Sequence, residues 1–142
     1  MTIAHTGIKT PAAVHPAVVA WYEAALAPLG YTKAVSILDN KVVGFADATG
    51  AVDWWVGSAA AAPPGVAVPV DDGAAAVTPT HTAFLAKDRA TVEAFHKAGV
   101  AAGGKCNGPP GVRARYSPTY FAAFVRDPVG NNMEAVCMTA EE

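Results

Sequence analysis

The sequence predicts an α+β fold made of two copies of one unit, in which a strand is followed by a helix and three further strands. Three pairs of residues recur at offsets of 74 to 80 positions: His5 and His81, Gly30 and Gly104, and Gly50 and Gly130. Such repetition marks tandem structural units whose loops differ slightly in length. Because 142 residues give room for one ordinary domain, we expect a single domain with module one over 1–57, a connector over 58–80 and module two over 81–142.

The composition is that of a folded chain and argues against several kinds of partner. Hydrophobic residues make up 52% of the chain and charged residues 15%, which is enough apolar side chain for a core. The net charge of −2 gives no basic face, so we expect no nucleic-acid partner. Apolar runs are too short to cross a membrane and the N-terminus lacks a secretory signal, which favours a cytoplasmic protein. The two cysteines do not suggest a disulfide framework.

Module one begins with a short strand that carries His5 and continues into a helix. Pro16 suits the first turn of a helix, apolar residues follow at helical spacing, and Gly30 is a natural stop. Turn sequences rich in Asp, Asn and Gly then separate three extended segments. The expected elements are strands over 3–9, 32–38, 41–46 and 52–56, with a helix between Pro16 and Gly30.

Module two repeats this order after a connector that is rich in Ala, Pro and Gly and has little periodicity. We expect one short extended piece inside the connector, at 66–70. Asp88 is a plausible helix cap, and Gly103-Gly104 ends the helix that follows. The other expected elements are strands over 81–86, 112–116 and 120–126, a loop over 107–111, and a closing strand after Gly130.

The closing strand carries the first sign of a functional site. Asp127-Pro128-Val129-Gly130 is turn chemistry, and the residues after it alternate so that Asn132, Glu134 and Val136 share one face. A carboxylate in an apolar strand needs an ion-pair partner, a proton or a bound cation. The candidates for a shared site with Glu134 are His5 and His81. An ion pair with Arg113, Arg115 or Arg126 is the alternative.

These residues resemble the vicinal oxygen chelate superfamily, which includes glyoxalase I, extradiol ring-cleaving dioxygenases, and fosfomycin- and bleomycin-resistance proteins. The resemblance covers nearly the whole chain apart from the connector. It rests on a histidine that opens each module, the Asn107-Gly108-Pro109-Pro110-Gly111 loop, and Asp127-Pro128-x-Gly130-Asn131-x-x-Glu134. It implies two βαβββ modules in tandem, whose mixed sheet curls around an open metal cleft.

Carried over by position, the resemblance implies His5, His81 and Glu134 as ligands of one divalent metal ion, with Fe, Zn, Ni, Co and Mn not distinguished. Four-ligand members of the superfamily place a Glu or Gln at the position that we equate with Trp54. An indole has no lone pair to offer, so three protein ligands remain. Two imidazoles and one carboxylate also form the facial triad of non-haem iron oxygenases.

Other residues near the expected cleft are candidates for contact with a substrate. Arg113 and Arg115 would suit an anionic, carboxylate or enolate substrate. Trp54 and Trp55 point to opposite faces of their strand, and we assign Trp54 to the wall of the cleft. Tyr116 and Tyr120 are candidates for proton transfer, because no free base is apparent beyond the metal ligands.

The expected function is that of a small divalent-metal-dependent enzyme that chelates neighbouring oxygens of a small organic substrate. The three-ligand set favours dioxygenase-like chemistry, and a glyoxalase-like lyase or isomerase is the first alternative. A metal-free small-molecule-binding protein of the bleomycin-resistance type is the second. A homodimer is one expected assembly, because the resemblance implies that modules pair either within a chain or between chains.

Overall fold

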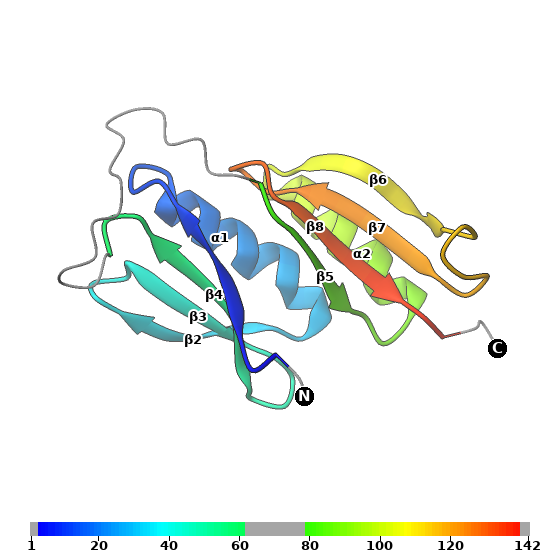
Figure 1. Cartoon of the computed structure of the whole chain (residues 1–142), viewed down its shortest axis with the longest axis horizontal. Coiled ribbons are helices and arrows are strands. Elements are labelled where there is room, and N and C mark those ends of the chain that lie inside the picture. The colour runs from blue at the N-terminus through cyan, green and yellow to red at the C-terminus, as the bar shows by residue number, and fades with distance from the viewer. Residues whose placement is uncertain (1–2, 62–78, 140–142) are drawn as a thin grey trace.

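The computed structural model describes residues 3–61 and 79–139 and shows two modules in tandem (Figure 1). Each module has one long helix and a four-stranded sheet, which confirms the predicted α+β class. The sheets are two separate mixed sheets, and they do not join into one curled sheet within the described part of the chain. In each sheet the first strand of the module runs parallel to the last, and the other pairs are antiparallel.

The elements follow the predicted order. Module one consists of β1 (Thr6–Thr10), α1 (His15–Leu26), the short 3-10 helix η1 (Ala27–Leu29), β2 (Thr32–Ile37), β3 (Val42–Ala46) and β4 (Val52–Ser58). Module two consists of β5 (His81–Leu85), α2 (Arg89–Ala101), β6 (Lys105–Val112), β7 (Phe121–Arg126) and β8 (Asn132–Cys137). The spatial orders are β1-β4-β3-β2 in the first sheet and β5-β8-β7-β6 in the second, so that β1 and β5 are edge strands.

Local sequence explains where the two helices begin and end. Asp88 caps α2 by accepting a hydrogen bond from the Thr91 amide at 2.7 Å, as its position before the helix predicts. Gly30 closes the first helical segment with a φ of 86°, a left-handed conformation that glycine adopts without the steric cost of a Cβ.

Helix α1 joins the two modules, because its apolar side chains are buried on more than one side. Val18, Trp21 and Tyr22 are almost completely buried, and α1 lies on the side of module one that faces module two (Figure 1). The Trp21 indole donates a hydrogen bond to the Gly99 carbonyl of α2 at 2.8 Å. The Tyr22 hydroxyl donates to Asp127, in the turn before β8, at 2.7 Å. These contacts hold α1 against α2 and against the turn that precedes β8.

The hydrogen bond from Tyr22 to Asp127 leads to a prediction about the stability of the fold. Burial, followed by the charge of Asp127, raises the pKa of Tyr22 well above its usual value. The unfolded chain therefore loses this proton near pH 10 while the folded chain keeps it, so this contribution to the free energy of unfolding falls as pH rises above about 10. We expect Tyr22→Phe to cost about 1–3 kcal/mol at neutral pH, because Asp127 loses a buried donor, and to flatten the decline between pH 9 and 11. Urea unfolding across that pH range measures both effects, with the exposed Tyr116→Phe as the matched control.

One expected element was wrong. Residues 107–111, expected as a loop, lie inside β6, and the chain after Val112 forms the loop that was expected as a strand. Strand β6 is an edge strand that pairs only with β7, and its pairing shifts register at Asn107 and around the two prolines. An edge strand tolerates proline because one side of its backbone needs no partner.

Three further expectations can be placed against the structure. Strand β1 starts at Thr6, so His5 directly precedes it. The extended piece expected at 66–70 lies outside the described residues. No helix in residues 3–61 and 79–139 is both long and apolar enough to cross a membrane.

Candidate functional site

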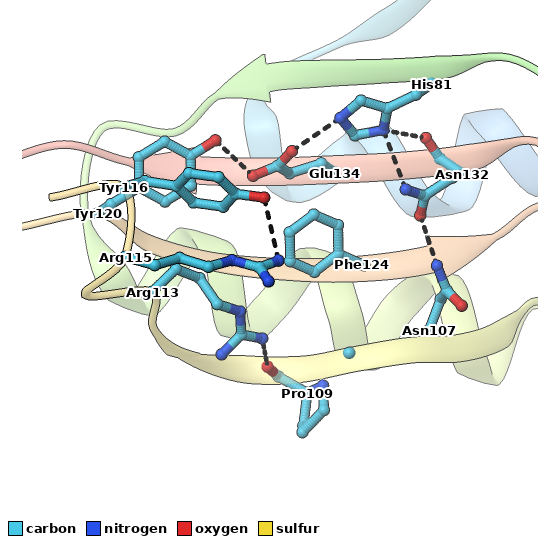
Figure 2. Close-up of a pocket in the computed structure, with 11 residues that line it drawn as sticks. His81, Asn107, Pro109, Arg113, Arg115, Tyr116, Tyr120, Phe124, Asn132 and Glu134 are labelled. Atoms are coloured by element: carbon cyan, nitrogen blue, oxygen red, sulfur yellow. Dashed lines mark hydrogen bonds and ion pairs between the residues drawn. The ribbon is translucent and has the colours of Figure 1, made fainter.

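The face of the second sheet that carries Glu134 holds a cleft of about 780 Å³, which we call the module-two cleft (Figure 2). Its walls come from β5, β6, β7, β8 and the loop between β6 and β7. The residues that line it are His81, Asn107, Gly108, Pro109, Arg113, Arg115, Tyr116, Tyr120, Phe124, Asn132 and Glu134. The loop and edge strand thus bring the predicted Arg113, Arg115, Tyr116 and Tyr120 to the same cleft as His81 and Glu134.

Glu134 is the buried centre of this cleft. Its exposed fraction is 2%, although it lies on the sheet face opposite the buried Met133 and Ala135. One carboxylate oxygen, Oε1, accepts a hydrogen bond from the Tyr120 hydroxyl at 2.7 Å. The other, Oε2, lies 3.1 Å from His81 Nε2. The partners of Glu134 are therefore a histidine and a tyrosine, and not the arginines that were the alternative.

A chain of hydrogen bonds reaches the other nitrogen of His81. Arg126 Nε, which can only donate, lies 3.1 Å from Asn107 Oδ1, and Asn107 Nδ2 then donates to Asn132 Oδ1 at 3.0 Å. This order directs Asn132 Nδ2 towards His81 Nδ1, also at 3.0 Å (Figure 2). When Nδ1 accepts this hydrogen bond, Nε2 carries the ring proton and donates a hydrogen bond to Glu134 Oε2. The site is then complete without a cation.

The same imidazole has a second, competing partner. His81 Nδ1 lies 2.9 Å from the main-chain carbonyl oxygen of Asn132, which can only accept a hydrogen bond. With the proton on Nδ1, the lone pair of Nε2 faces Glu134 Oε2, and two lone pairs at that distance repel unless a cation or proton lies between them. Histidines that bind metals usually donate their other N–H to a carbonyl or carboxylate in this way. The surroundings of His81 therefore fit either tautomer.

The spacing of the two side chains also fits a metal ion. Two ligand atoms that each lie about 2.1 Å from one cation, at an angle of about 90–110°, are about 3.0–3.4 Å apart. The Nε2–Oε2 distance of 3.1 Å falls within this range. Residues 3–61 and 79–139 contain no group of three His, Cys, Asp or Glu side chains placed to hold a metal. The described residues of one chain thus bring together two of the three expected ligands, His81 and Glu134.

The rest of the cleft is suited to a negatively charged ligand. Among the described residues that line it, Glu134 is the only carboxylate, while Arg113 and Arg115 are both cationic. Arg113 stacks over Phe124 with its Cζ 5.4 Å from the ring centre, and Arg115 over Tyr116 at 4.8 Å. Arg113 donates a hydrogen bond to the Pro109 carbonyl, and Arg115 donates one to the Tyr116 hydroxyl. Neither guanidinium contacts a carboxylate among the described residues.

Tyr120 is held in its protonated form. Burial, followed by its hydrogen bond to Glu134 and the charge of that carboxylate, raises the pKa of Tyr120 to about 12. At neutral pH its hydroxyl therefore keeps its proton and donates a hydrogen bond to Glu134. Tyr116 packs against it with the ring centres 5.1 Å apart but is largely exposed, with 58% of its surface accessible.

His5 lies elsewhere in the chain. It is exposed, lines none of the module-two cleft, and sits 6.4 Å from the Trp55 ring on the first sheet, beside a cavity of about 420 Å³. The structure therefore brings His81 and Glu134 together within one chain but does not bring His5 to them.

The assignment of Trp54 needs correction. In the second sheet Glu134 pairs with the residue two positions after His81, and in the first sheet the residue two positions after His5 pairs with Trp55. Trp55 is thus the structural equivalent of Glu134. Trp54 points to the helix side, is 1% exposed, and packs 5.3 Å from Tyr22. The sequence offset of 80 is one residue too long for this strand because β4 contains one extra residue: Phe45 pairs with Trp54 and Ala46 with Val52, whereas β7 and β8 pair without a shift.

Two functional candidates were missed from the sequence. Asn132 shares a face with Glu134 by strand alternation, so its period-two spacing was a usable signal. Asn107 offered no such signal, because it reaches the site only through the irregular pairing of β6 with β7.

Comparison with known proteins identifies the fold. No protein-family model and no curated protein sequence matches the chain. A glyoxalase/bleomycin resistance protein from Albidiferax ferrireducens is similar in structure, at 22% identity and a TM-score of 0.64, over 93% of this chain and 96% of that one. A lactoylglutathione lyase from Agrobacterium tumefaciens matches at 19% identity and 0.61, over 93% and 91%.

A third similar structure is a glyoxalase/bleomycin resistance protein/dioxygenase family enzyme from Burkholderia phytofirmans, at 15% identity and a TM-score of 0.65, over 98% of this chain and all of that one. All three span nearly the whole of both chains, so the likeness includes both modules and their arrangement. The chain therefore has the fold of the glyoxalase/bleomycin-resistance/dioxygenase proteins, as its resemblance to the vicinal oxygen chelate superfamily predicts.

Proposed function

We propose that this protein is a small metal-dependent enzyme of the glyoxalase/dioxygenase type, with a divalent ion held by His81 and Glu134. The observation that carries this proposal is the pairing of His81 Nε2 with Glu134 Oε2 at 3.1 Å, while His81 Nδ1 has a main-chain carbonyl as an acceptor. That arrangement supplies one imidazole, one buried carboxylate and the outer partner that orients the imidazole. Because the expected ligands are two histidines and one carboxylate, we favour dioxygenase-like chemistry over that of a lyase or isomerase.

We further propose that the third ligand is His5 of a second copy of the chain, in a homodimer. Two features support this. His5 is exposed and lies on the open face of the first sheet, away from the module-two cleft of its own chain. Strand β1 directly follows His5 and strand β5 begins at His81, and both are edge strands of their sheets among the described residues. Loss of the dimer in dilute protein should then weaken metal binding, which metal titration at several protein concentrations would detect.

The residues of the cleft have separable roles. A divalent ion bound there supplies Lewis-acid polarisation of neighbouring substrate oxygens. Tyr120, protonated at neutral pH, donates a hydrogen bond that orients Glu134, and Tyr120 and Tyr116 are the candidates for proton transfer with a substrate. Tyr116 also accepts a hydrogen bond from the Arg115 guanidinium. Arg113 and Arg115, which contact no carboxylate among the described residues, bind an anionic group of the substrate, such as a carboxylate.

The test is elemental analysis of protein purified without chelator or a histidine tag, alongside Glu134→Ala. The proposal predicts close to one metal ion per chain in the unmodified protein and loss of that metal in the variant. Iron would favour oxygenase chemistry, whereas zinc or nickel would favour a lyase or isomerase. Absence of metal from both proteins, with none taken up on adding divalent ions, would contradict the proposal.

A metal-free binding protein is the second candidate, and one observation favours it. Both oxygens of Glu134 already have protein partners, and the hydrogen bonds from Arg126 to His81 close the site without a cation. Under this alternative, ligand affinity would be unchanged by chelators.

A pair of chelating ligands that differ in charge tests the role of Arg113. In metal-loaded protein, Arg113→Gln should weaken oxalate binding about 10-fold, because a charge-assisted contact to a carboxylate is lost. Catechol, which offers neighbouring oxygens without a carboxylate, should bind with nearly unchanged affinity. Calorimetric titration measures both ligands, and Lys33→Gln, on the first sheet, is the matched control. Equal weakening of both ligands would mean that Arg113 shapes the cleft and does not recognise charge.

A further inference from the structure

A second cavity, of about 550 Å³, lies between the two modules and is separate from the module-two cleft. We call it the intermodule cavity. Module one contributes the segment around Tyr31 and the start of β4, and module two contributes β5 from Thr82 to Leu85. Neither His81 nor Glu134 lines it. The residues that line it therefore form a second, separate candidate site.

Two buried polar atoms on residues that line this cavity have no hydrogen-bond partner. They are Oδ1 of Asp53, an acceptor, and Nε1 of Trp54, a donor whose side chain is 1% exposed. Buried polar atoms in folded proteins are almost always paired with protein, water or ligand. Adjacent residues that line the same cavity thus leave an acceptor and a donor unpaired; both atoms have almost no accessible surface, so a polar ligand group reaches them by displacing neighbouring side-chain atoms.

The Asp53 carboxylate is held in place by its other oxygen. The Tyr31 hydroxyl donates to Asp53 Oδ2 at 3.1 Å, which leaves Oδ1 as the unused acceptor. Burial, followed by this hydrogen bond, raises the pKa of Tyr31, so the hydroxyl keeps its proton and remains a donor. A second carboxylate at the cavity, Asp47, is already used by Thr49 and Ala51 in its own turn.

The remaining walls are aromatic and apolar. Phe84 meets the Tyr31 ring edge to face at 5.6 Å and the Trp54 ring at 5.2 Å, so three rings from both modules enclose one side. Among the described residues that line the cavity there is no Lys or Arg, while two carboxylates and the imidazole of His5 are present. The cavity thus combines negative charge with aromatic surface, the opposite of the module-two cleft.

We propose that the intermodule cavity binds a small organic cation with an apolar body, such as an arylalkyl amine, through its ammonium group at Asp53 and its apolar body against Phe84 and Trp54. A carboxylate gains a charge-assisted hydrogen bond from an ammonium, and aromatic faces attract both the cation and its hydrocarbon. This proposal does not rest on metal binding, although His5, the third metal ligand proposed for a homodimer, also lines the intermodule cavity.

The test uses 2-phenylethylamine as the probe and the indole N–H resonances of the three tryptophans as the readout, on full-length protein labelled with ¹⁵N. The Trp54 resonance should shift saturably, whereas that of Trp21, already bonded to Gly99, should not move. The neutral 2-phenylethanol should bind at least about 10-fold more weakly, and 3-phenylpropionate should not bind, because Asp53 repels it.

Asp53→Asn should lower the affinity for 2-phenylethylamine about 10-fold, since it removes the charge and keeps the shape. Asp39→Asn is the matched control and should change it by less than about twofold, because Asp39 is exposed and lines none of the three cavities described. The comparison of three ligands on the unmodified protein stands even if a variant fails to fold. No saturable shift of Trp54, equal binding of amine, alcohol and carboxylate, or an unchanged affinity in Asp53→Asn would each overturn the proposal.

Discussion

Replacing Glu134 by Gln should lower the affinity of the protein for divalent cations by at least about 100-fold. Loss of an outer hydrogen-bond partner of a metal ligand already costs about 10–100-fold, and this change removes the ligand's charge itself. The substitution retains the size of the side chain, and an amide oxygen can still accept from Tyr120. We therefore expect the metal-free variant to fold like the unmodified protein. Competition titration against a chromophoric chelator measures the affinity.

Glu93→Gln is the matched control, because Glu93 is exposed on α2 and lines no cavity described above. It removes the same charge from the same chain and should leave the affinity unchanged. If Glu134→Gln bound cations as tightly as the unmodified protein, His81 and Glu134 would not be the site, and the hydrogen-bonded pair would have a structural role.

Replacing Trp21 by Ala should lower the free energy of unfolding by about 3–5 kcal/mol, the usual cost of removing a large buried aromatic side chain. Trp21 is 1% exposed, donates to the Gly99 carbonyl of α2, and meets Tyr22 edge to face at 4.8 Å. A Cβ on Gly104 would lie 2.7 Å from its indole nitrogen, so the glycine leaves room for the ring. Since a domain of this size has about 5–15 kcal/mol in total, the variant should be close to unfolding. Urea denaturation provides the measurement.

A milder variant separates packing from hydrogen bonding. Trp21→Phe retains an aromatic ring but removes the indole donor, so the Gly99 carbonyl keeps the Gly104 amide as its donor, and the loss of one hydrogen bond should cost about 0.5–1.5 kcal/mol. The half-buried Trp55→Phe is the comparison for loss of an indole outside the main core. Similar costs for Trp21→Ala and Trp55→Phe would mean that α1 is not the element that joins the modules.

Much of the architecture could be predicted because it depends on patterns among residues that are close together in the sequence. The period-two alternation after Gly130 placed Glu134 on the face opposite Met133 and Ala135, and β8 has that arrangement. The cap at Asp88 and the stop at Gly30 depend on neighbouring residues, so they too were readable.

The remaining features depend on contacts between distant residues. Strand β6 contains the Pro-rich segment because it occupies a free edge, and edge position is a property of the assembled sheet. Tyr22 and Asp127 meet although 105 positions separate them, and nothing local marks either as the other's partner. The equivalence of Glu134 with Trp55 was missed by one residue for the same reason, since strand pairing and not sequence offset defines it.

The most direct test of the central claim, that His81 and Glu134 hold a divalent cation, is the protonation state of the His81 ring. Long-range ¹H–¹⁵N spectra of histidine-labelled protein report which nitrogen carries the proton, and His81→Gln assigns the signal. On adding Zn²⁺, the proposal predicts that Nε2 of His81 shifts to a metal-bound value while Nδ1 carries the proton towards the Asn132 carbonyl. Unchanged His81 signals at saturating Zn²⁺, or a shift confined to His15 and His96, would contradict it.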